Sequence, residues 1–311
     1  MKTVYSVKNK EEAIYYNKKV YNGSFGVNYD QIHNNLNVNH YLQKIYYKNL
    51  GEIINDLRKS YSSLNMMDVG TGTGALSLNF YKYLKSEDRV YNLDISEVML
   101  ANLKNKLSQE QILQSSFIVD DAFNFLNKSV QNFHIIGFSG ALHHFYDYDK
   151  IINLAASKVL PEGYIYIGVE PKNKVIYLER VIRNIESIYY RFRMKEISFL
   201  SFLIKICYTP FHFFNKFIYK KEKNQNTINK FDYNLEEQGK TEILHGLDLK
   251  LIKTILYQNS FNIIKLQGSP GYIYNFTYRL VNFLKINDHF LLIAKKKYLN
   301  KLLIKALDGV I

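Results

Sequence analysis

The chain has 311 residues, of which 47% are hydrophobic and 22% charged, and its formal net charge is +13. This composition supports a packed core and excludes a wholly disordered chain. The single cysteine, Cys207, excludes a disulfide framework, a cysteine-based zinc cluster and the three-cysteine ligand set of an iron–sulfur centre. We therefore expect no metal site.

The charge is unevenly distributed along the chain. Residues 1–170 hold 17 basic and 17 acidic side chains, whereas residues 171–311 hold 24 and 11. The second half therefore predicts either a surface for phosphate, nucleic acid or anionic lipid, or only a solvated basic face. The N-terminus lacks the apolar core of a signal peptide, so we expect a cytoplasmic protein.

Strands and helices alternate along most of the chain. After a start with turn signals only, apolar spacing predicts a helix from residue 38 to about 57. Strands are then predicted at 65–69, 90–93, 117–119, 133–137, 164–169, 261–266 and 289–294, and helices at 75–84, 97–107, 147–159 and 248–258. Repeated βα units require parallel strands with right-handed crossovers. The predicted fold class is therefore α/β, with a doubly wound, seven-stranded, mostly parallel sheet.

The alternation is interrupted between residues 174 and 240. This segment holds an aromatic stretch, Ile197–Tyr219, with basic residues near both ends. Internal polar residues and Pro210 make it a poor transmembrane span, but a lid over a hydrophobic acceptor, a helical pair on the sheet and an interfacial membrane helix remain alternatives. We predict four parts: an N-terminal extension at 1–37, a cofactor-binding core at 38–173, a helical lid insertion at 174–240 and the completion of the core at 241–311.

A glycine-rich turn follows the first predicted strand. The sequence from Asp68 to Gly74 reads Asp-Val-Gly-Thr-Gly-Thr-Gly and leads into a helix. Glycine at every second position lets the backbone approach a ligand closely. Nicotinamide and flavin proteins use glycine turns at the same place, so the turn alone predicts only nucleotide binding.

Acidic residues end the next two predicted strands. Asp94 lies 20 residues after Gly74, and Asp121 lies a further 27 residues on, preceded by Asp120. A carboxylate after the second strand can accept hydrogen bonds from both ribose hydroxyls, and one after the third can reach an adenine amino group. All three features lie at the carboxyl ends of strands, where ligands bind in open α/β sheets.

This order resembles the class I S-adenosylmethionine-dependent methyltransferase family over about residues 38–170 and 240–296. Residues 68–74 match the first family motif, residues 139–144 (Ser-Gly-Ala-Leu-His-His) match the stretch after the fourth strand, and residues 160–164 match the turn before the fifth. The resemblance implies S-adenosylmethionine as cofactor, with Gly70 and Gly72 facing its methionine part, Asp94 at the ribose and Asp121 at the adenine. The implied cofactor residues are Asp68, Gly70, Thr71, Gly72, Gly74, Asp94, Ile95, Asp120, Asp121, Ala122 and Ser139.

Two positions depart from the family pattern. His134 stands where an acidic residue is common, so a catalytic carboxylate is not expected there. Asp120 stands where glycine is frequent, so the roles of Asp120 and Asp121 could be exchanged.

Three histidines are candidate catalytic bases. His143 and His144 follow the fourth strand, and His245 precedes the helix before the sixth. A histidine can take a proton from a hydroxyl acceptor near neutral pH. The alternative for each is structural: packing beneath the cofactor for the first two, and a helix-entry residue for His245. Glu170 is predicted either to hydrogen-bond an acceptor or to face solvent.

The sequence therefore predicts an S-adenosylmethionine-dependent methyltransferase acting on a small-molecule or lipid-like acceptor at oxygen. The chain has no Asn/Asp-Pro-Pro-aromatic run and no Pro-Cys dipeptide, which disfavours methylation of nucleic-acid bases. The alternative is an RNA-binding or membrane-peripheral protein that retains the cofactor-binding fold.

Overall fold

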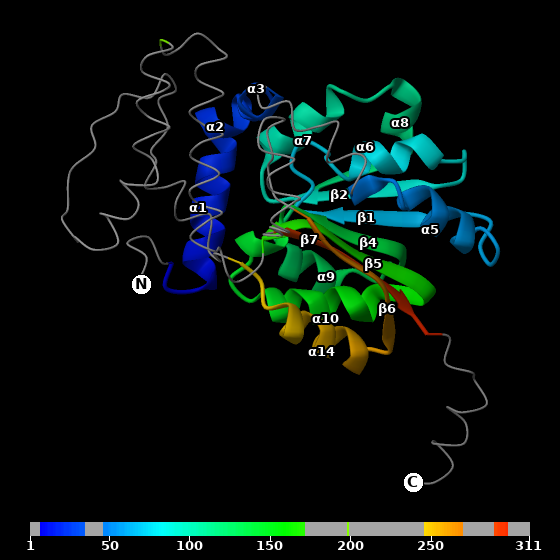
Figure 1. Ribbon diagram of the computed structural model, residues 1–311. Coiled ribbons are helices and arrows are strands. Elements are labelled where there is room, and N and C mark those ends of the chain that lie inside the picture. Colours follow the sequence, from blue (N-terminus) through cyan, green and yellow to red (C-terminus); the bar gives the residue numbers. More distant parts are fainter. Residues whose placement is uncertain (1–6, 35–45, 172–197, 199–245, 270–288, 298–311) are drawn as a thin grey trace.

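The computed structural model describes residues 7–34, 46–171, 198, 246–269 and 289–297. Seven strands form one sheet in the order β3-β2-β1-β4-β5-β7-β6 (Figure 1). They are β1 (Asn65–Val69), β2 (Arg89–Asp94), β3 (Ser115–Val119), β4 (Phe133–Ser139), β5 (Val159–Pro171), β6 (Phe261–Ser269) and β7 (His289–Lys296). The first five strands are parallel, and β7 pairs antiparallel with both β5 and β6. The predicted seven-stranded, mostly parallel α/β sheet is confirmed.

Two hydrophobic clusters cover the two faces of this sheet. One joins side chains of β4, β5 and β7 to α9 (Ala122–Lys128), α10 (Tyr148–Lys158) and α14 (Leu249–Gln258). The other joins alternate side chains of the same strands to α5 (Leu50–Leu57) and α6 (Ser77–Phe80). Because successive strand residues point to opposite faces, both faces of the central strands are apolar, as a buried parallel sheet requires.

Several predicted elements differ from the observed ones in their bounds. The helix expected at 75–84 is α6 followed by a 3-10 turn, η2 (Tyr81–Tyr83), and the helix expected at 97–107 is α7 (Glu97–Lys104). The turn expected at residues 161–163 lies inside β5 as a bulge, because Phe133 pairs with Val159 while Ile135 pairs with Tyr164. The short helices α8 (Gln109–Leu113) and α9 were not predicted.

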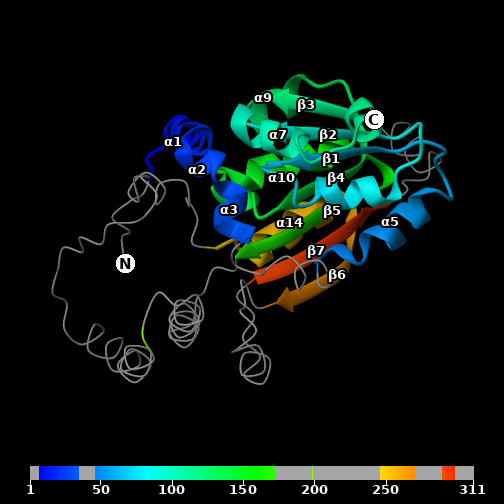
Figure 2. The ribbon, with the colours of Figure 1, turned by 90° about the horizontal axis from the view of Figure 1, so that it is seen from above.

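Three helices precede the sheet in the chain: α1 (Lys10–Asn22), α2 (Ser24–Val27) and α3 (Tyr29–Asn34). In Figures 1 and 2 they lie together at the end of the sheet toward which the parallel strands point. The sequence predicted only turns here. We call residues 10–34 the N-terminal cap.

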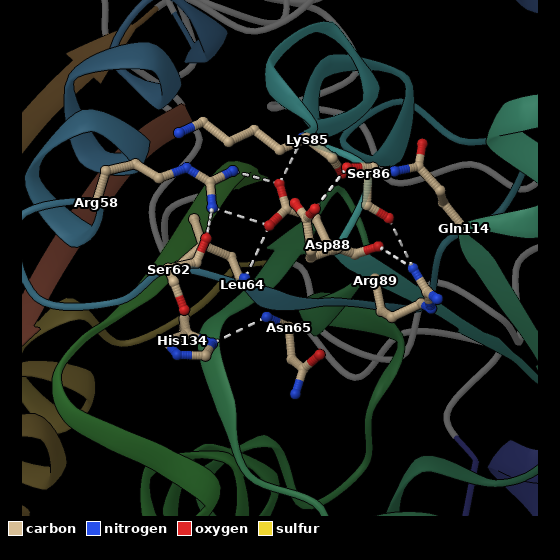
Figure 3. A network of polar contacts seen from close by, with 11 residues as sticks. Arg58, Ser62, Leu64, Asn65, Lys85, Ser86, Asp88, Arg89, Gln114 and His134 are labelled. Atoms are coloured by element: carbon tan, nitrogen blue, oxygen red, sulfur yellow. Dashed lines mark hydrogen bonds and ion pairs between the residues drawn. The ribbon is translucent and has the colours of Figure 1, made fainter.

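A buried polar network ties together the amino ends of the strands (Figure 3). The Asp88 carboxylate is fully buried and accepts hydrogen bonds from both terminal nitrogens of Arg58. The backbone amides of Leu64 and Lys85 donate to the same carboxylate, at 2.8 Å and 2.7 Å. His134 also belongs to this edge: its Nδ1 accepts the Asn65 amide at 2.9 Å, so it is a structural residue at the opposite end of β4 from the glycine turn.

The proposed lid at 174–240, except Ser198, and the candidate base His245 lie outside the described residues, and so does most of the basic excess. The four-part division of the chain stays a prediction. Within the described ranges, no helix combines the length and the apolar character that a membrane crossing needs.

Candidate functional site

A cavity opens at the carboxyl ends of β1, β2, β3 and β4, between the sheet and the N-terminal cap. Its walls come from the glycine turn, the residues that follow β2, β3 and β4, and the inner side of the cap. The wall residues include Lys10, Asn17, Tyr21, Gly70, Thr71, Gly72, Thr73, Asp94, Ile95, Asp120, Asp121, Ala122, Phe123, Ser139 and His144. The cavity therefore lies where the sequence predicted the ligand.

The glycine turn has a backbone that requires glycine. Gly70 and Gly72 have φ of +67° and +55°, in the left-handed region that side chains with a Cβ rarely adopt. A Cβ on Gly70 would lie 2.6 Å from the Cβ of Ala141 in the loop after β4. The turn is held from behind, since the Gly70 and Thr71 amides both donate to the carbonyl oxygen of Leu93, at 2.9 Å and 3.0 Å.

Two predicted cofactor residues support the turn without lining the cavity. Asp68 is 1% exposed, and its Oδ2 accepts the amide of Ser77, the first residue of α6, at 3.0 Å and lies 2.7 Å from the Ser77 hydroxyl oxygen. Gly74 has φ +95° and packs behind the turn, where a Cβ would lie 2.4 Å from Leu103. Both residues shape the loop from beneath rather than facing a ligand.

Asp94 presents a buried carboxylate to the cavity. Its two oxygens accept the Gly72 amide at 2.7 Å and the Ser96 amide at 2.8 Å. Burial raises the pKa of this carboxyl to about 6, against the opposing effect of the amide donors. A carboxylate has about four acceptor sites, so after two amide bonds Asp94 can still accept from a ligand hydroxyl.

The acids after β3 have different local partners. Asp121 is the N-cap of α9, where its Oδ2 accepts the Asn124 amide at 3.1 Å, and it lies 3.7 Å from Lys10 of the cap. Asp120 is engaged through both oxygens by the side-chain amide of Asn124, at 2.9 Å and 2.8 Å. Both acids line the cavity with Ala122, and their binding of the cofactor stays a prediction.

The two histidines after β4 face different surroundings. His144 lines the cavity, and its Nε2 lies 3.4 Å from the hydroxyl of Tyr21 in the cap. His143 instead places Nδ1 2.8 Å from Glu170 Oε2. Although the two rings are 4.1 Å apart, only His144 reaches the cavity.

Glu170 does not face solvent, so that prediction was wrong, whereas its binding to an acceptor stays a prediction. It is fully buried at the end of β5 and accepts the backbone amides of Ala141, Leu142 and His143 at 2.8 Å, 2.8 Å and 3.2 Å. Val169, just before it, has φ +60° at a bulge against β7. Glu170 thus fixes the loop that carries both histidines.

The cap makes contacts with the cavity loops that the sequence did not predict, and Lys10, Asn17 and Tyr21 of the cap line the cavity. Asn17 donates to the carbonyl of His144 at 3.3 Å, and Asp30 accepts the Thr73 hydroxyl at 2.7 Å. The Ser96 hydroxyl reaches the carbonyl of Tyr21 and the side chain of Asn22, at 2.8 Å each. One signal could have located α1, because Asn9 with Glu12 three residues later is a helix start: Asn9 Oδ1 accepts the Glu12 amide, and Glu12 accepts the Lys8 amide.

The remaining predicted cofactor residues also lie at the cavity. Ile95, Thr71 and Ser139 line the cavity, and the Ser139 hydroxyl lies 2.7 Å from that of Tyr47. No group of three or more His, Cys, Asp or Glu side chains that could hold a metal occurs in the described part of the chain.

Residues 60–204, close to half of the chain, match the family model described as a methyltransferase domain. The chain carries a methyltransferase domain. The match begins just before β1 and includes the glycine turn, Asp94, the acids after β3 and the histidine pair, so the predicted family and enzyme class are confirmed.

Solved structures confirm the fold of this methyltransferase. The magnesium protoporphyrin IX methyltransferase of Synechocystis PCC 6803 with bound S-adenosylmethionine shares 15% identity and a TM-score of 0.52, covering 95% of this chain and all of that one. The same protein with bound S-adenosylhomocysteine gives 15% identity and a TM-score of 0.50, covering 90% and 98%. At this identity the likeness concerns the fold. No curated protein sequence matches significantly.

Proposed function

We propose that this methyltransferase moves a methyl group from S-adenosylmethionine to an oxygen of a small-molecule acceptor. The observation that carries the proposal is the position of Asp94, a buried carboxylate beside the glycine turn at the carboxyl end of β2. An acid there suits a ligand with vicinal hydroxyls, as in a ribose. The neighbouring solved structures, named for a methyltransferase with bound S-adenosylmethionine or S-adenosylhomocysteine, support the same donor.

The chemistry of the cavity walls fits this donor part by part. Gly70 and Gly72 bring backbone close to the cavity, which suits the zwitterionic methionine end. Ile95, Ala122 and Phe123 give an apolar wall for a flat ring. Because Asn124 engages both oxygens of Asp120, Asp121 is the better partner for an adenine amino group. When bound, the donor supplies an electrophilic methyl group on a sulfonium.

On the acceptor side, we assign His144 as the base that takes the proton from an acceptor hydroxyl. His144 faces the cavity and lies next to the Tyr21 hydroxyl, so ring and phenol together can hold an acceptor oxygen. His143 serves as a positioning residue, since Glu170 engages its Nδ1. A methyl transfer mainly requires alignment of the reacting atoms, which is worth up to roughly 7–11 kcal/mol, and Glu170 holds the loop that would provide it.

The nature of the acceptor beyond a small molecule is part of the proposal. A lipid-like acceptor rests on the aromatic stretch at 197–219, and the alternative of RNA or membrane binding rests on the basic second half. Both lie almost wholly outside the described residues. Neither has a described contact in its favour, so we advance no second function.

Calorimetric titration with S-adenosylhomocysteine tests the donor. The wild type and Glu87→Ala, which removes an exposed carboxylate at the far edge of the sheet, should bind alike. Asp94→Ala should lose about 1.5–3 kcal/mol of binding free energy, the value of hydrogen bonds to a charged group. Equal affinity in Asp94→Ala and the wild type, or no binding by the wild type, would reject the donor site.

Transfer of a labelled methyl group to a panel of hydroxyl-bearing small molecules tests the acceptor side. His144→Ala should lower the rate about 10²–10⁴-fold with donor affinity kept, because general base catalysis is worth that much. His143→Ala should lower the rate less. If His143→Ala proved the more damaging change, the assignment of the base would be wrong.

A further inference from the structure

A series of buried polar contacts between side chains begins beneath the glycine turn and runs from β1 through β2 to the start of β3. Asp68 Oδ2 lies 2.7 Å from Ser77 Oγ, and Ser77 Oγ lies 2.5 Å from Asn92 Oδ1 on β2. All three side chains are buried, with exposures of 1%, 0% and 0%. These are the first two contacts of what we call the Asp68 relay.

The relay continues from β2 to the start of β3. Asn92 Nδ2 lies 3.0 Å from the Tyr81 hydroxyl, which lies 2.5 Å from Ser115 Oγ. Ser115 Oγ lies 2.5 Å from the carbonyl oxygen of Gln111 in α8. The relay therefore consists of five contacts and ends on a group that can only accept.

Each of these contacts needs one hydrogen between its two heavy atoms. The hydroxyls of Ser77, Tyr81 and Ser115 carry one hydrogen each. The side-chain amide of Asn92 turns its nitrogen to one neighbour and its oxygen to the other, so it also gives the relay one hydrogen in either orientation. Four hydrogens are thus available for five contacts, and only Asp68 can supply the fifth.

We infer that Asp68 is held as a neutral carboxylic acid that donates its proton to Ser77 Oγ, and that this proton positions the glycine turn. Asp68 Oδ2 can accept the Ser77 amide, at 3.0 Å, while its own hydrogen points to the Ser77 hydroxyl. Oδ1 has no hydrogen-bond partner within the described ranges, which a neutral carbonyl oxygen tolerates better than a carboxylate.

The electrostatic surroundings of Asp68 agree with a neutral acid. The titratable groups that face it are Asp94 after β2, Tyr81 of η2 and Tyr166 of β5. Each of them is neutral or negative when it titrates, and no cation of the described chain is paired with Asp68. Burial raises the pKa of Asp68 to about 7, and the charge of Asp94 acts in the same direction.

The proton matters because Asp68 joins the two elements that the turn connects. It is the next-to-last residue of β1, and its side chain holds the first residue of α6. Ionisation would leave one relay contact without a hydrogen and place a negative charge under the turn, next to Asp94. The turn should therefore loosen as the pH rises through the pKa of Asp68.

Carbon-13 NMR of the full chain labelled at aspartate Cγ tests the inference directly. The Asp68 signal is assigned through its β protons, so no variant is needed for assignment. We expect it to titrate near neutral pH. Titration near the ordinary value of about 4 would overturn the inference. The measurement uses no methyl donor, so its outcome is independent of the proposed function.

Shortening the relay tests the proton count. Ser115→Ala leaves three contacts, and Ser77, Asn92 and Tyr81 can then supply three hydrogens once the Asn92 amide turns over. Asp68 should become about tenfold more acidic, because ionisation no longer breaks a hydrogen bond. The matched control is Ser116→Ala, on the same strand but facing the opposite side of the sheet. An Asp68 titration unchanged in Ser115→Ala would overturn the relay.

Tyr81→Phe provides an independent variant. It leaves two contacts connected to Asp68, for which Ser77 and Asn92 supply the hydrogens, and the separate Ser115–Gln111 contact, which keeps the Ser115 hydrogen. The same increase in acidity is therefore expected. Tyr164→Phe is its control, since the Tyr164 hydroxyl bonds to Asp56 outside the relay. If Ser115 and Tyr81 had structural roles alone, Ser115→Ala and Tyr81→Phe would lower the free energy of unfolding without changing the Asp68 titration.

Discussion

The two edges of the parallel sheet treat a buried aspartate in opposite ways. At the amino edge, burial alone would raise the pKa of Asp88, but the Arg58 guanidinium and two backbone amides hold it below its ordinary value. At the carboxyl edge, Asp94 receives only backbone amides, and burial raises its pKa to about 6. The charge of Asp88 is balanced by a cation, and the charge of Asp94 is not.

This difference distinguishes polar groups that stabilise the fold from polar groups that are suited to binding a ligand. A carboxylate that is already paired with a cation gains little from a ligand. A buried carboxylate that has only neutral donors is stabilised when its charged form accepts further hydrogen bonds. A ligand with hydroxyl groups can supply these hydrogen bonds. The amino edge therefore stabilises the fold, and the carboxyl edge is prepared for binding.

The largest expected effect comes from Arg58→Ala at the amino edge. It leaves the Asp88 charge buried and without its cation, which costs about 3–5 kcal/mol of unfolding free energy. Urea unfolding measures the loss. The control is Arg89→Ala, whose exposed guanidinium donates to the carbonyls of Ser86 and Asp88 and should change stability by less than about 0.5 kcal/mol. Equal losses of unfolding free energy in Arg58→Ala and Arg89→Ala would mean that the Arg58–Asp88 pair adds no more stability than an exposed arginine does.

Gly70→Ala should have the next largest effect, at the carboxyl edge. The left-handed backbone and the contact with Ala141 together cost about 2–4 kcal/mol of unfolding free energy. Gly72→Ala shares the left-handed backbone but meets its nearest atom only at 3.4 Å, so it should cost about 1–2 kcal/mol. A ranking in the opposite order, measured by urea unfolding, would contradict the observed packing of the turn.

The two edges should also respond to pH with opposite signs. The raised pKa of Asp94 means that its contribution to stability is complete below about pH 4 and is lost as the pH rises toward 6 and above. The lowered pKa of Asp88 means that its contribution is present above about pH 4 and is lost on further acidification. In urea unfolding at several pH values, Asp94→Asn should reduce the decline between pH 4 and 7 by about 1–3 kcal/mol. Asp149→Asn, outside the cavity, should leave the decline unchanged.

The smallest effect is expected where the cap meets the glycine turn. Asp30 pairs with Lys106 at 2.6 Å, but both side chains are 31% exposed. Asp30→Asn should therefore cost less than about 1 kcal/mol of unfolding free energy, and added salt should reduce the difference further. A loss as large as that of Arg58→Ala would show that the cap is bound as firmly as the amino edge.

Much of this fold could be predicted because the parallel core has strong local signals. The strand at 65–69 was predicted with its observed bounds. Asp94 was predicted at the end of the second strand, where β2 does end, and Asp121 just after the third strand, two residues beyond the end of β3. Continuous apolar strands and a glycine turn are dictated by the buried sheet itself. The residues that face the cofactor cavity on the sheet side were therefore accessible from the sequence.

The rest depends on contacts between distant residues. Glu170 turns under the histidine loop only because Val169 adopts φ +60° at a bulge, which no local pattern encodes. The roles of His143 and His144 differ because Glu170 engages the first and Tyr21 approaches the second. The buried face of α1 includes the polar Asn17, so apolar periodicity gave no indication of the cap.

The N-terminal cap has a consequence for the order of folding. Its contacts are made with residues far along the chain: Tyr21 with Ser96, and Asn17 and Tyr21 with His144, at separations of 75, 127 and 123 residues. Such long-range contacts form late, because the chain between them must first be ordered. The cap helices, although they precede the sheet in the chain, are thus expected to dock after it, so the cavity is built open and is closed by the cap only when β4 is in place.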